Sequence, residues 1–381
     1  MSVENNLSPR CWVPGADWAQ DQGQIQAWLT GWQVAYPQGG VLALVSEASR
    51  SDIPALQALI GEQGGCLLGA VFPALVVDGL FTNHGILLLA LPEHPAYRLQ
   101  PDIGAGKLSE LALTDFILSH SHRSGEDAAF FIFDGMLPDI ASFLERIYRE
   151  VGDQVRYCGA NAGSETFKSI PCVFDQERVL ANAALVMMLP SQPDVVISHD
   201  YQLGAETVMA TSAQGNRITQ IDHRPALQVY QELLQREYGV VLTRENFYQH
   251  AVHFPFGILR AEGQPLVRIP VALDEDGAIY CVGELPANAL LAVLRAIEPG
   301  NPATATTLAK GLHSNLNVLF YCAGRRMHLG VQADHELQLL SQQLGAQGVC
   351  GALSLGEIAA TASGYPLFHN AALLGMPWRC A

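Results

Sequence analysis

Three segments of the chain repeat the same order of elements: a buried strand, a helix and a second strand. In the first segment, apolar residues fill 41–45, recur at helical spacing at Leu56, Leu59 and Ile60, and begin a second strand at Cys66. The same order recurs as strand 129–133, helix 138–151 and strand 155–160, and as strand 317–321, helix 334–344 and strand 349–352. Each second strand carries a Gly-Ala pair, namely Gly69-Ala70, Gly159-Ala160 and Gly351-Ala352. This repetition predicts internal duplication, and the connections predict parallel strands joined by right-handed crossovers.

The stretch between the second and third units has a different pattern. Short runs rich in Val, Ile, Thr and Met predict antiparallel strands, and Asp274 to Gly277 predicts a hairpin turn. Helices are predicted over 225–238, 288–296 and 302–312, and a turn over 322–325. We therefore predict an α/β (mixed α+β) fold with mixed sheets flanked by helices. It is divided into two packed halves: residues 1–195 hold two units, and residues 196–381 hold antiparallel strands and then the third unit.

Composition excludes several classes of partner. A formal net charge of -16 leaves no basic footprint for nucleic acid, and it argues equally against an anionic membrane surface. The most apolar stretch, Cys66 to Leu91, is interrupted by Pro73 and Asp78, so it predicts two buried strands joined by a turn at Asp78-Gly79 and no membrane span. The first residues contain neither a basic region nor an apolar region of a signal peptide. We therefore expect a cytoplasmic protein whose eight cysteines are reduced thiols.

The segment near the C-terminus combines glycines with isolated polar residues. An apolar strand ends at Gly356, the carboxylate of Glu357 follows, and a Ser/Gly loop leads to His369-Asn370. Glu357 and His369 are twelve residues apart, so the loop can fold back and bring both side chains to one site. Spacing alone favours the simpler interpretation of a strand, a turn and a second strand, in which His369 only bonds a neighbouring backbone group.

Catalytic motifs are absent from the sequence. There is no Gly-x-Gly-x-x-Gly, Walker, Gly-x-Ser-x-Gly or His-Glu-x-x-His motif. Cys322 precedes Gly324-Arg325, where an arginine could lower a thiol pKa, but no base lies at a defined spacing. His250 and His253 are three residues apart, yet Pro255 disfavours a helix there and no carboxylate or cysteine completes a metal set. We expect a structural cysteine, solitary histidines and no enzyme.

Several of these elements together resemble a known family. The strand ending in Cys322-Ala-Gly324-Arg325 is similar to a Cys-x-Gly-Arg element, Gly356-Glu357-Ile358 to a Gly-Glu-Ile element, and Phe368-His369-Asn370 to a His-Asn element of FIST-domain proteins. Phe254 to Gly257 and Pro225 to Leu227 also fit. The resemblance spans most of the chain and is most specific in its last third. The first unit departs from it, because no acidic residue follows Gly69-Ala70.

The resemblance implies a bacterial sensory protein made of an N-terminal and a C-terminal FIST part. Some stand-alone members of similar length bind haem b, sense nitric oxide and regulate a partner histidine kinase, and no further signalling motif is left over in this chain. The implied ligand pocket comprises Cys322, Arg325, Gly356, Glu357, His369 and Asn370. One histidine in an apolar pocket suffices for a pentacoordinate haem. His199, which ends a buried strand, and then His313, which ends a helix, are the candidate axial ligands.

A second hypothesis needs no haem. The same pocket would hold a small polar metabolite such as an amino acid, with Glu357 binding the ammonium group and Arg325 the carboxylate.

Overall fold

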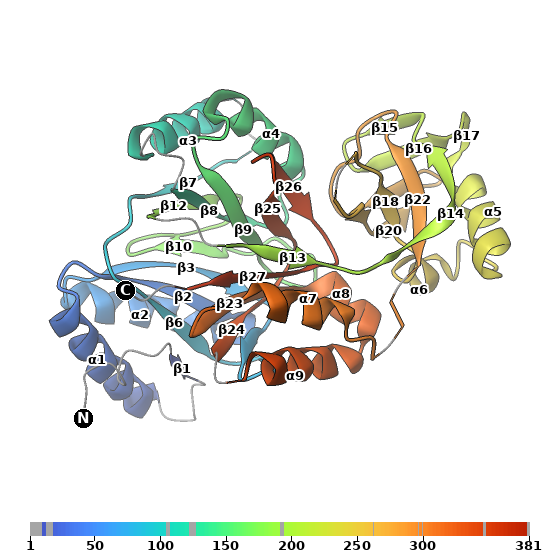
Figure 1. The fold of residues 1–381 in the computed structure, drawn as a ribbon. Coiled ribbons are helices and arrows are strands. Elements are labelled where there is room, and N and C mark those ends of the chain that lie inside the picture. The colour runs from blue at the N-terminus through green and yellow to red at the C-terminus, as the bar shows by residue number, and fades with distance from the viewer. Residues whose placement is uncertain are drawn as a thin grey trace.

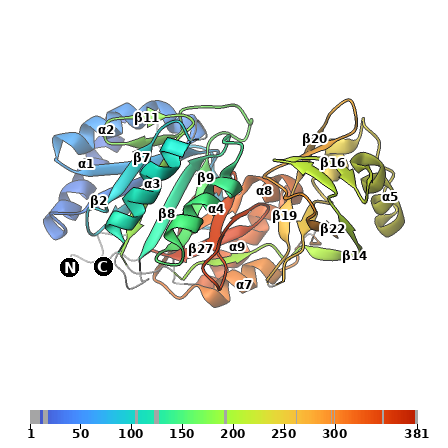
Figure 2. The ribbon, with the colours of Figure 1, turned by 90° about the horizontal axis from the view of Figure 1, so that it is seen from above.

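The computed structural model describes residues 10–12, 18–103, 107–121, 127–190, 194–261, 263–295, 297–298, 300–345 and 348–378. It has the predicted mixed α/β fold: three six-stranded sheets with helices packed on them form a core, and a lobe of antiparallel strands projects from one side (Figures 1 and 2). The core consists of three repeats, which we number 1 (residues 10–91), 2 (97–189) and 3 (196–377).

Within the described residues, each repeat contains six strands and two helices in the same order; repeat 1 adds a 3-10 turn, and repeat 3 adds the short helix α8 and the inserted lobe. Repeat 1 comprises β1 (Arg10–Trp12), α1 (Trp18–Ala35), β2 (Gly40–Ser46), a 3-10 turn (Glu47–Asp52), α2 (Ile53–Glu62), β3 (Cys66–Phe72), β4 (Leu75–Val77), β5 (Leu80–Thr82) and β6 (Ile86–Leu91). Repeat 2 comprises β7 (Tyr97–Gln100), α3 (Lys107–His120), β8 (Ala128–Asp134), α4 (Ile140–Val151), β9 (Arg156–Ala162), β10 (Val173–Asp175), β11 (Val179–Leu180) and β12 (Ala184–Leu189). Repeat 3 comprises β13 (Val196–Ser198), α7 (Ala303–Gly311), β23 (Leu316–Cys322), α8 (Ala323–Leu329), α9 (Gln332–Leu344), β24 (Gly348–Ser354), β25 (Glu357–Ala360), β26 (Pro366–His369) and β27 (Leu373–Pro377).

The three predicted strand–helix–strand units are confirmed as parallel pairs with one register. β2 pairs with β3, β8 with β9 and β23 with β24, and a glycine occupies the fourth of seven paired positions in every ladder. A Cβ atom on any of these glycines would overlap the carbonyl oxygen of the residue opposite, on Ala43, Phe131 and Leu319 respectively. The Gly69, Gly159 and Gly351 positions are thus fixed by the close approach of two backbones.

The repeats also exchange hairpins in a cycle. The β10–β11 hairpin of repeat 2 extends the sheet of repeat 1, the β25–β26 hairpin of repeat 3 extends that of repeat 2, and the β4–β5 hairpin of repeat 1 extends that of repeat 3. One equivalent backbone hydrogen bond secures each exchange: Val71 N to Cys172 O (2.8 Å), Asn161 N to Gly356 O (2.9 Å) and Leu353 N to Ala74 O (2.9 Å). The two predicted halves therefore share sheets, while the predicted boundary after residue 195 itself stays a prediction.

The lobe is an insertion into repeat 3, between β13 and α7. Its elements are β14 (Gln202–Met209), β15 (Ser212–Gln214), β16 (Arg217–Ile221), β17 (Arg224–Pro225), α5 (Ala226–Tyr238), α6 (Phe247–Ala251), β18 (Phe256–Ile258), β19 (Leu266–Arg268), β20 (Pro270–Leu273), β21 (Ile279–Cys281) and β22 (Leu290–Arg295). It has a hydrophobic core of its own, in which α5 packs on both small sheets. We call residues 199–302 the lobe; one segment leads into it after β13 and another returns after β22 (Figure 1).

Three local predictions are wrong. The segment predicted as a helix over 288–296 forms β22, because its short apolar run pairs with β14 on one side and β18 on the other, and periodicity cannot distinguish a buried strand from a helix over that length. The residues after Cys322, predicted as a turn, begin α8. The 66–91 stretch forms four strands, and the Asp78-Gly79 turn joins β4 to β5.

Two expectations concern the environment of the chain. The six cysteines whose side chains are described are free and buried, as expected of small apolar residues; Cys11 and Cys380 lie outside the described side chains. Within the described part of the chain, no helix has both the length and the apolarity needed to cross a membrane.

The glycine requirement can be tested by Gly351→Ala. The added methyl group would collide with the backbone of Leu319, so we expect a loss of about 3 kcal/mol or more in the free energy of unfolding, measured by urea denaturation. Gly31→Ala in α1 is the matched control: beyond its own helix backbone, no described atom lies within 4 Å of where its Cβ would stand, and it should be neutral or stabilise by about 0.5–1 kcal/mol. Equal stability of both variants would refute the proposed role of the ladder glycine.

Candidate functional site

The predicted fold-back of the C-terminal segment is present as the β25–β26 ribbon. Glu357, the first residue of β25, pairs directly with His369, the last residue of β26. Opposed residues of an antiparallel pair point to the same face, so the two side chains are neighbours. The ribbon lies on β9 of repeat 2 and turns toward the lobe (Figure 1).

Glu357 is fully buried and only partly satisfied. Ser354 Oγ donates to its Oε1 at 2.6 Å, whereas its Oε2 has no hydrogen-bond partner among the described residues. Burial is the largest influence and raises the pKa of Glu357 well above its ordinary value, while Ser354, Cys322, the backbone of Ala372 and the charge of Arg325 act to lower it. Leu75 and Val173 begin the equivalent strands β4 and β10. The fold therefore accepts an apolar residue here, and the carboxyl group of Glu357 serves some other purpose.

Cys322 is a buried residue that positions a turn. Its Sγ accepts a hydrogen bond from Ala371 N at 3.1 Å, and Ala371 has a left-handed backbone (φ 56°). In repeat 2 the equivalent Asp134 accepts a bond from the left-handed Asn182 (φ 49°) at 2.7 Å. Burial, followed by the nearby Glu357, raises the pKa of the Cys322 thiol, which disfavours the reactive thiolate.

Arg325 uses all its donors within the protein. Nε and Nη2 bond the two carboxylate oxygens of Glu336 at 2.9 and 2.7 Å, Nη2 also bonds Thr304 Oγ1 at 2.8 Å, and Nη1 bonds the carbonyl oxygens of His199 (2.8 Å) and Ala371 (3.3 Å). These five bonds match the five N–H groups of a guanidinium. Arg325 thus joins α7, α9 and the entry to the lobe, and it has no N–H left for a ligand carboxylate in this arrangement.

Asn370 and Gly356 hold the ribbon against the lobe. Asn370 Nδ2 donates to the lobe carbonyl of Val282 at 3.1 Å, while its buried Oδ1 has no partner among the described residues. Gly356 has φ 151°, and a Cβ there would overlap the ring of Phe368. Both residues therefore shape the junction between lobe and core.

Arg268 is the site residue that sequence reasoning missed. It ends β19 of the lobe, is 1% exposed, and lies 5.7 Å from the centre of the Phe368 ring. Its Nε donates to Glu284 O (2.7 Å) and its Nη1 to Phe368 O (3.1 Å), but within the described residues Nη2 has no hydrogen bond and the guanidinium has no ion pair. Burial lowers the pKa of Arg268 to about 10, so it stays charged at neutral pH. The available signal was an arginine inside the apolar run Leu266 to Val271.

His369 lies beside Glu357 in the β25–β26 ribbon. It is partly buried and adjoins Phe368, whose carbonyl Arg268 bonds, while Glu357 lies directly across the ladder. Burial, then His199 and the positive charges of Arg268 and Arg260, lower the pKa of His369 to about 3. A neutral imidazole is therefore the cross-strand neighbour of a buried carboxyl group and lies within the electrostatic influence of a buried guanidinium.

The two candidate haem ligands are placed differently. His199 is 3% exposed and uses both ring nitrogens: Nε2 donates to Pro265 O at 2.8 Å, and Nδ1 accepts from Tyr201 N at 3.0 Å. Its pKa is lowered to about 4, chiefly by burial. His313 is exposed in the loop after α7. Neither imidazole is a free nitrogen ligand facing an apolar pocket.

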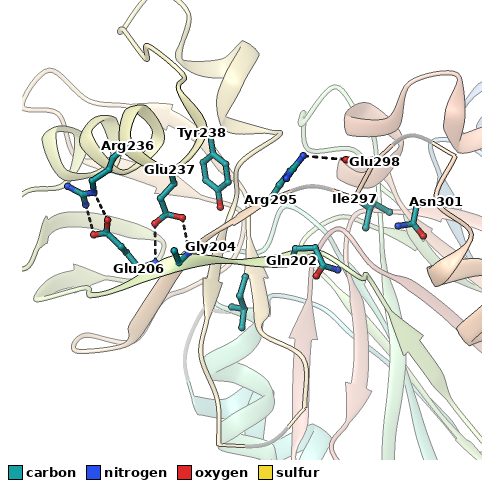
Figure 3. A pocket seen from close by; sticks show the side chains of 12 residues that line it. Gln202, Gly204, Glu206, Arg236, Glu237, Tyr238, Arg295, Ile297, Glu298 and Asn301 are labelled. Atoms are coloured by element: carbon teal, nitrogen blue, oxygen red, sulfur yellow. Dashed lines mark hydrogen bonds and ion pairs between the residues drawn. The ribbon is translucent and has the colours of Figure 1, made fainter.

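A separate hollow of about 660 Å³ lies beside the lobe entry (Figure 3). Its lining includes Gln202, Gly204, Tyr238 and Asn301 and none of the predicted site residues. Its charged groups are already engaged: Arg236 pairs with Glu206, Arg295 with Glu298, and Glu237 accepts from the backbone of Ala205 and Glu206. This hollow therefore offers space without an unsatisfied charge.

Comparison with known families gives two adjoining matches. Residues 41–224 match the FIST N domain and residues 226–360 match the FIST C domain, so the two matches meet inside the lobe. A search of curated proteins finds no match. Together the two domains span most of the chain, including Arg268 and Glu357, whereas β26 and the residues after it follow the matched part. The chain is therefore a FIST-domain protein, a member of a family associated with signalling sensor roles.

Proposed function

We propose that this protein is a signalling sensor that binds a small amino-acid-like metabolite where the lobe meets repeats 2 and 3. The observation that carries the proposal is the buried guanidinium of Arg268, whose Nη2 donates no hydrogen bond and which forms no ion pair among the described residues. An unpaired buried charge is costly, and an anionic ligand relieves that cost. A ligand carboxylate is the group that a guanidinium fork binds best.

Glu357 supplies the complementary end. Its Oε2 is buried and without a described partner, and the equivalent positions in repeats 1 and 2 are apolar. A ligand ammonium group would favour the charged carboxylate and return its pKa toward the ordinary value. Arg268 thereby replaces Arg325 as the residue proposed to bind the carboxylate, because the donors of Arg325 are all engaged.

Such a ligand would join two parts of the molecule. Arg268 belongs to the lobe and Glu357 to the core. A ligand that contacts both stabilises the position in which the lobe packs against the core, which we call the seated lobe. It therefore shifts the population toward the seated lobe. The signal would then pass to another protein, for which a partner histidine kinase is the candidate that the family resemblance suggests.

The two histidines that we considered as axial ligands do not support the hypothesis that the protein binds haem b and senses nitric oxide. Coordination by His199 would break its bonds to Pro265 and Tyr201, and His313 lies on the surface. These residues do not fit an axial ligand, and we derive no step through haem. A catalytic role for Cys322 is also not proposed, since its thiol is buried and bonded to Ala371 N.

Ligand binding can be tested by thermal shift with a panel of amino acids. At about 100 times its dissociation constant, a bound amino acid should stabilise the wild-type protein by about 2.7 kcal/mol and raise its Tm. Arg268→Gln and Glu357→Gln each remove one charged contact, so both should abolish the shift, while Arg268→Lys should restore part of it.

Arg236→Gln is the matched control, because Arg236 lines the hollow of Figure 3 and is exposed. It should leave the ligand-induced shift unchanged. Loss of the shift in Arg236→Gln with retention in Arg268→Gln would move the site to that hollow and contradict the proposal.

Haem reconstitution gives a second, separate test. We expect the purified protein incubated with haem b to show no Soret band that moves when nitric oxide is added. A stoichiometric band that His199→Gln abolishes would instead make His199 an axial ligand and reverse our reading of its two hydrogen bonds.

A further inference from the structure

A pair of imidazoles joins the lobe to the core at a point separate from the site proposed at Arg268 and Glu357. His253 follows α6 of the lobe, His328 lies on α8 of repeat 3, and their Nδ1 atoms are 2.5 Å apart. The two rings meet edge to face, and both are partly buried. We propose that this pair is an acid-released latch that holds the lobe against the core, a regulatory device that does not depend on the proposed ligand.

The bonds around the pair define which nitrogen carries each proton. The backbone carbonyl of Ile297, which can only accept, acts on His328 and favours a ring proton; because Nδ1 faces His253, we assign that proton to the Nε2 of His328. Its Nδ1 is then an acceptor, and the Nδ1–H of His253 is the donor to it. The chain of bonds runs from the lobe through α8 to the segment that returns from the lobe.

Protonation of His328 would break this arrangement. Its Nδ1 would gain a hydrogen and face the Nδ1–H of His253, so two donors would oppose each other with no acceptor between them. The seated lobe therefore requires at least His328 to be neutral.

The surroundings of the pair also disfavour charge. Burial and then His250, one helical turn away, lower the pKa of His253. Burial, His253 and the positive charge of Arg325 lower the pKa of His328 to about 4, while the Ile297 carbonyl opposes this. The ring of Tyr201 lies on the remaining side, 5.9 Å from that of His328. Among the described residues, the charged groups that act on the pair are histidines and Arg325, which are cationic when protonated.

The direction of the pH effect follows from linkage. An imidazole freed by lobe opening titrates near its ordinary pKa of about 6.5, and in the seated lobe it titrates lower. The latch thus contributes fully to the stability of the seated lobe above about pH 6.5. This contribution is lost as the pH falls toward the pKa of His328 in the seated lobe, about 4. At pH 5.5 His328 reduces the ratio of seated to open lobe by about tenfold relative to pH 7.5, and His253, whose pKa is also lowered, acts in the same direction.

Hydrogen exchange of the ligand-free full chain tests the latch. Amides in residues 252–258 and 323–330 should lose about tenfold or more of their protection between pH 7.5 and 5.5, after correction for intrinsic exchange. His328→Asn keeps an acceptor oxygen near the Nδ1 position but cannot be protonated there. Its loss of protection should be at least tenfold smaller than that of the wild type, since His199 and His369 still titrate in both proteins.

His250→Gln is the control, because it removes a neighbouring imidazole outside the pair and should show the wild-type fall. Equal losses of hydrogen-exchange protection in the wild type and in His328→Asn would contradict the proposed latch. NMR titration of the wild-type rings serves where the variant is unstable: His328 should titrate well below 6.5, and an ordinary pKa would equally reject the proposal.

Discussion

Backbone hydrogen bonds between repeats hold this molecule together. Each second parallel strand is paired on one side with its own repeat and on the other with a hairpin from another repeat, and the cycle closes because repeat 1 completes the sheet of repeat 3. No repeat can leave without exposing a full row of unpaired N–H and C=O groups, which is costly in a buried setting. The glycine in each ladder permits the two parallel strands of a repeat to approach each other closely. The core is thereby a rigid support for side chains at the hairpin starts.

The near-threefold arrangement also separates structural residues from others. Equivalent positions with the same residue type in all three repeats, such as Gly69, Gly159 and Gly351, are required by the fold. Cys322 and Asp134 differ in type but hold the same left-handed turn, so both are structural. Glu357 has only apolar equivalents and stands out from this pattern.

The sequence predicted the repeated units because they rest on local apolar periodicity and on glycines. The sequence also predicted that Glu357 and His369 lie close together, because a short loop determines that pairing. The roles of individual arginines could not be predicted in the same way. Arg325 lies in a motif, yet its N–H groups form hydrogen bonds with Glu336 and with backbone carbonyls. Arg268 lies in an ordinary apolar run, and its Nη2 forms no hydrogen bond among the described residues. Such differences depend on contacts between residues as far apart as Arg268 and Phe368, which no local pattern records.

The lobe is the part of the structure whose position can carry a signal. It contacts repeat 3 through Asn370 and His328, and it contacts repeat 2 through Glu284, which accepts hydrogen bonds from the backbone N–H and hydroxyl of Ser142 in the first turn of α4. A carboxylate at a helix N-terminus is stabilised by the unpaired N–H groups and the helix dipole. Displacing the lobe withdraws Glu284 and leaves the start of α4 uncapped. The same movement separates Arg268 from the β25–β26 ribbon, so occupation of that junction and the state of a surface helix of repeat 2 are physically coupled.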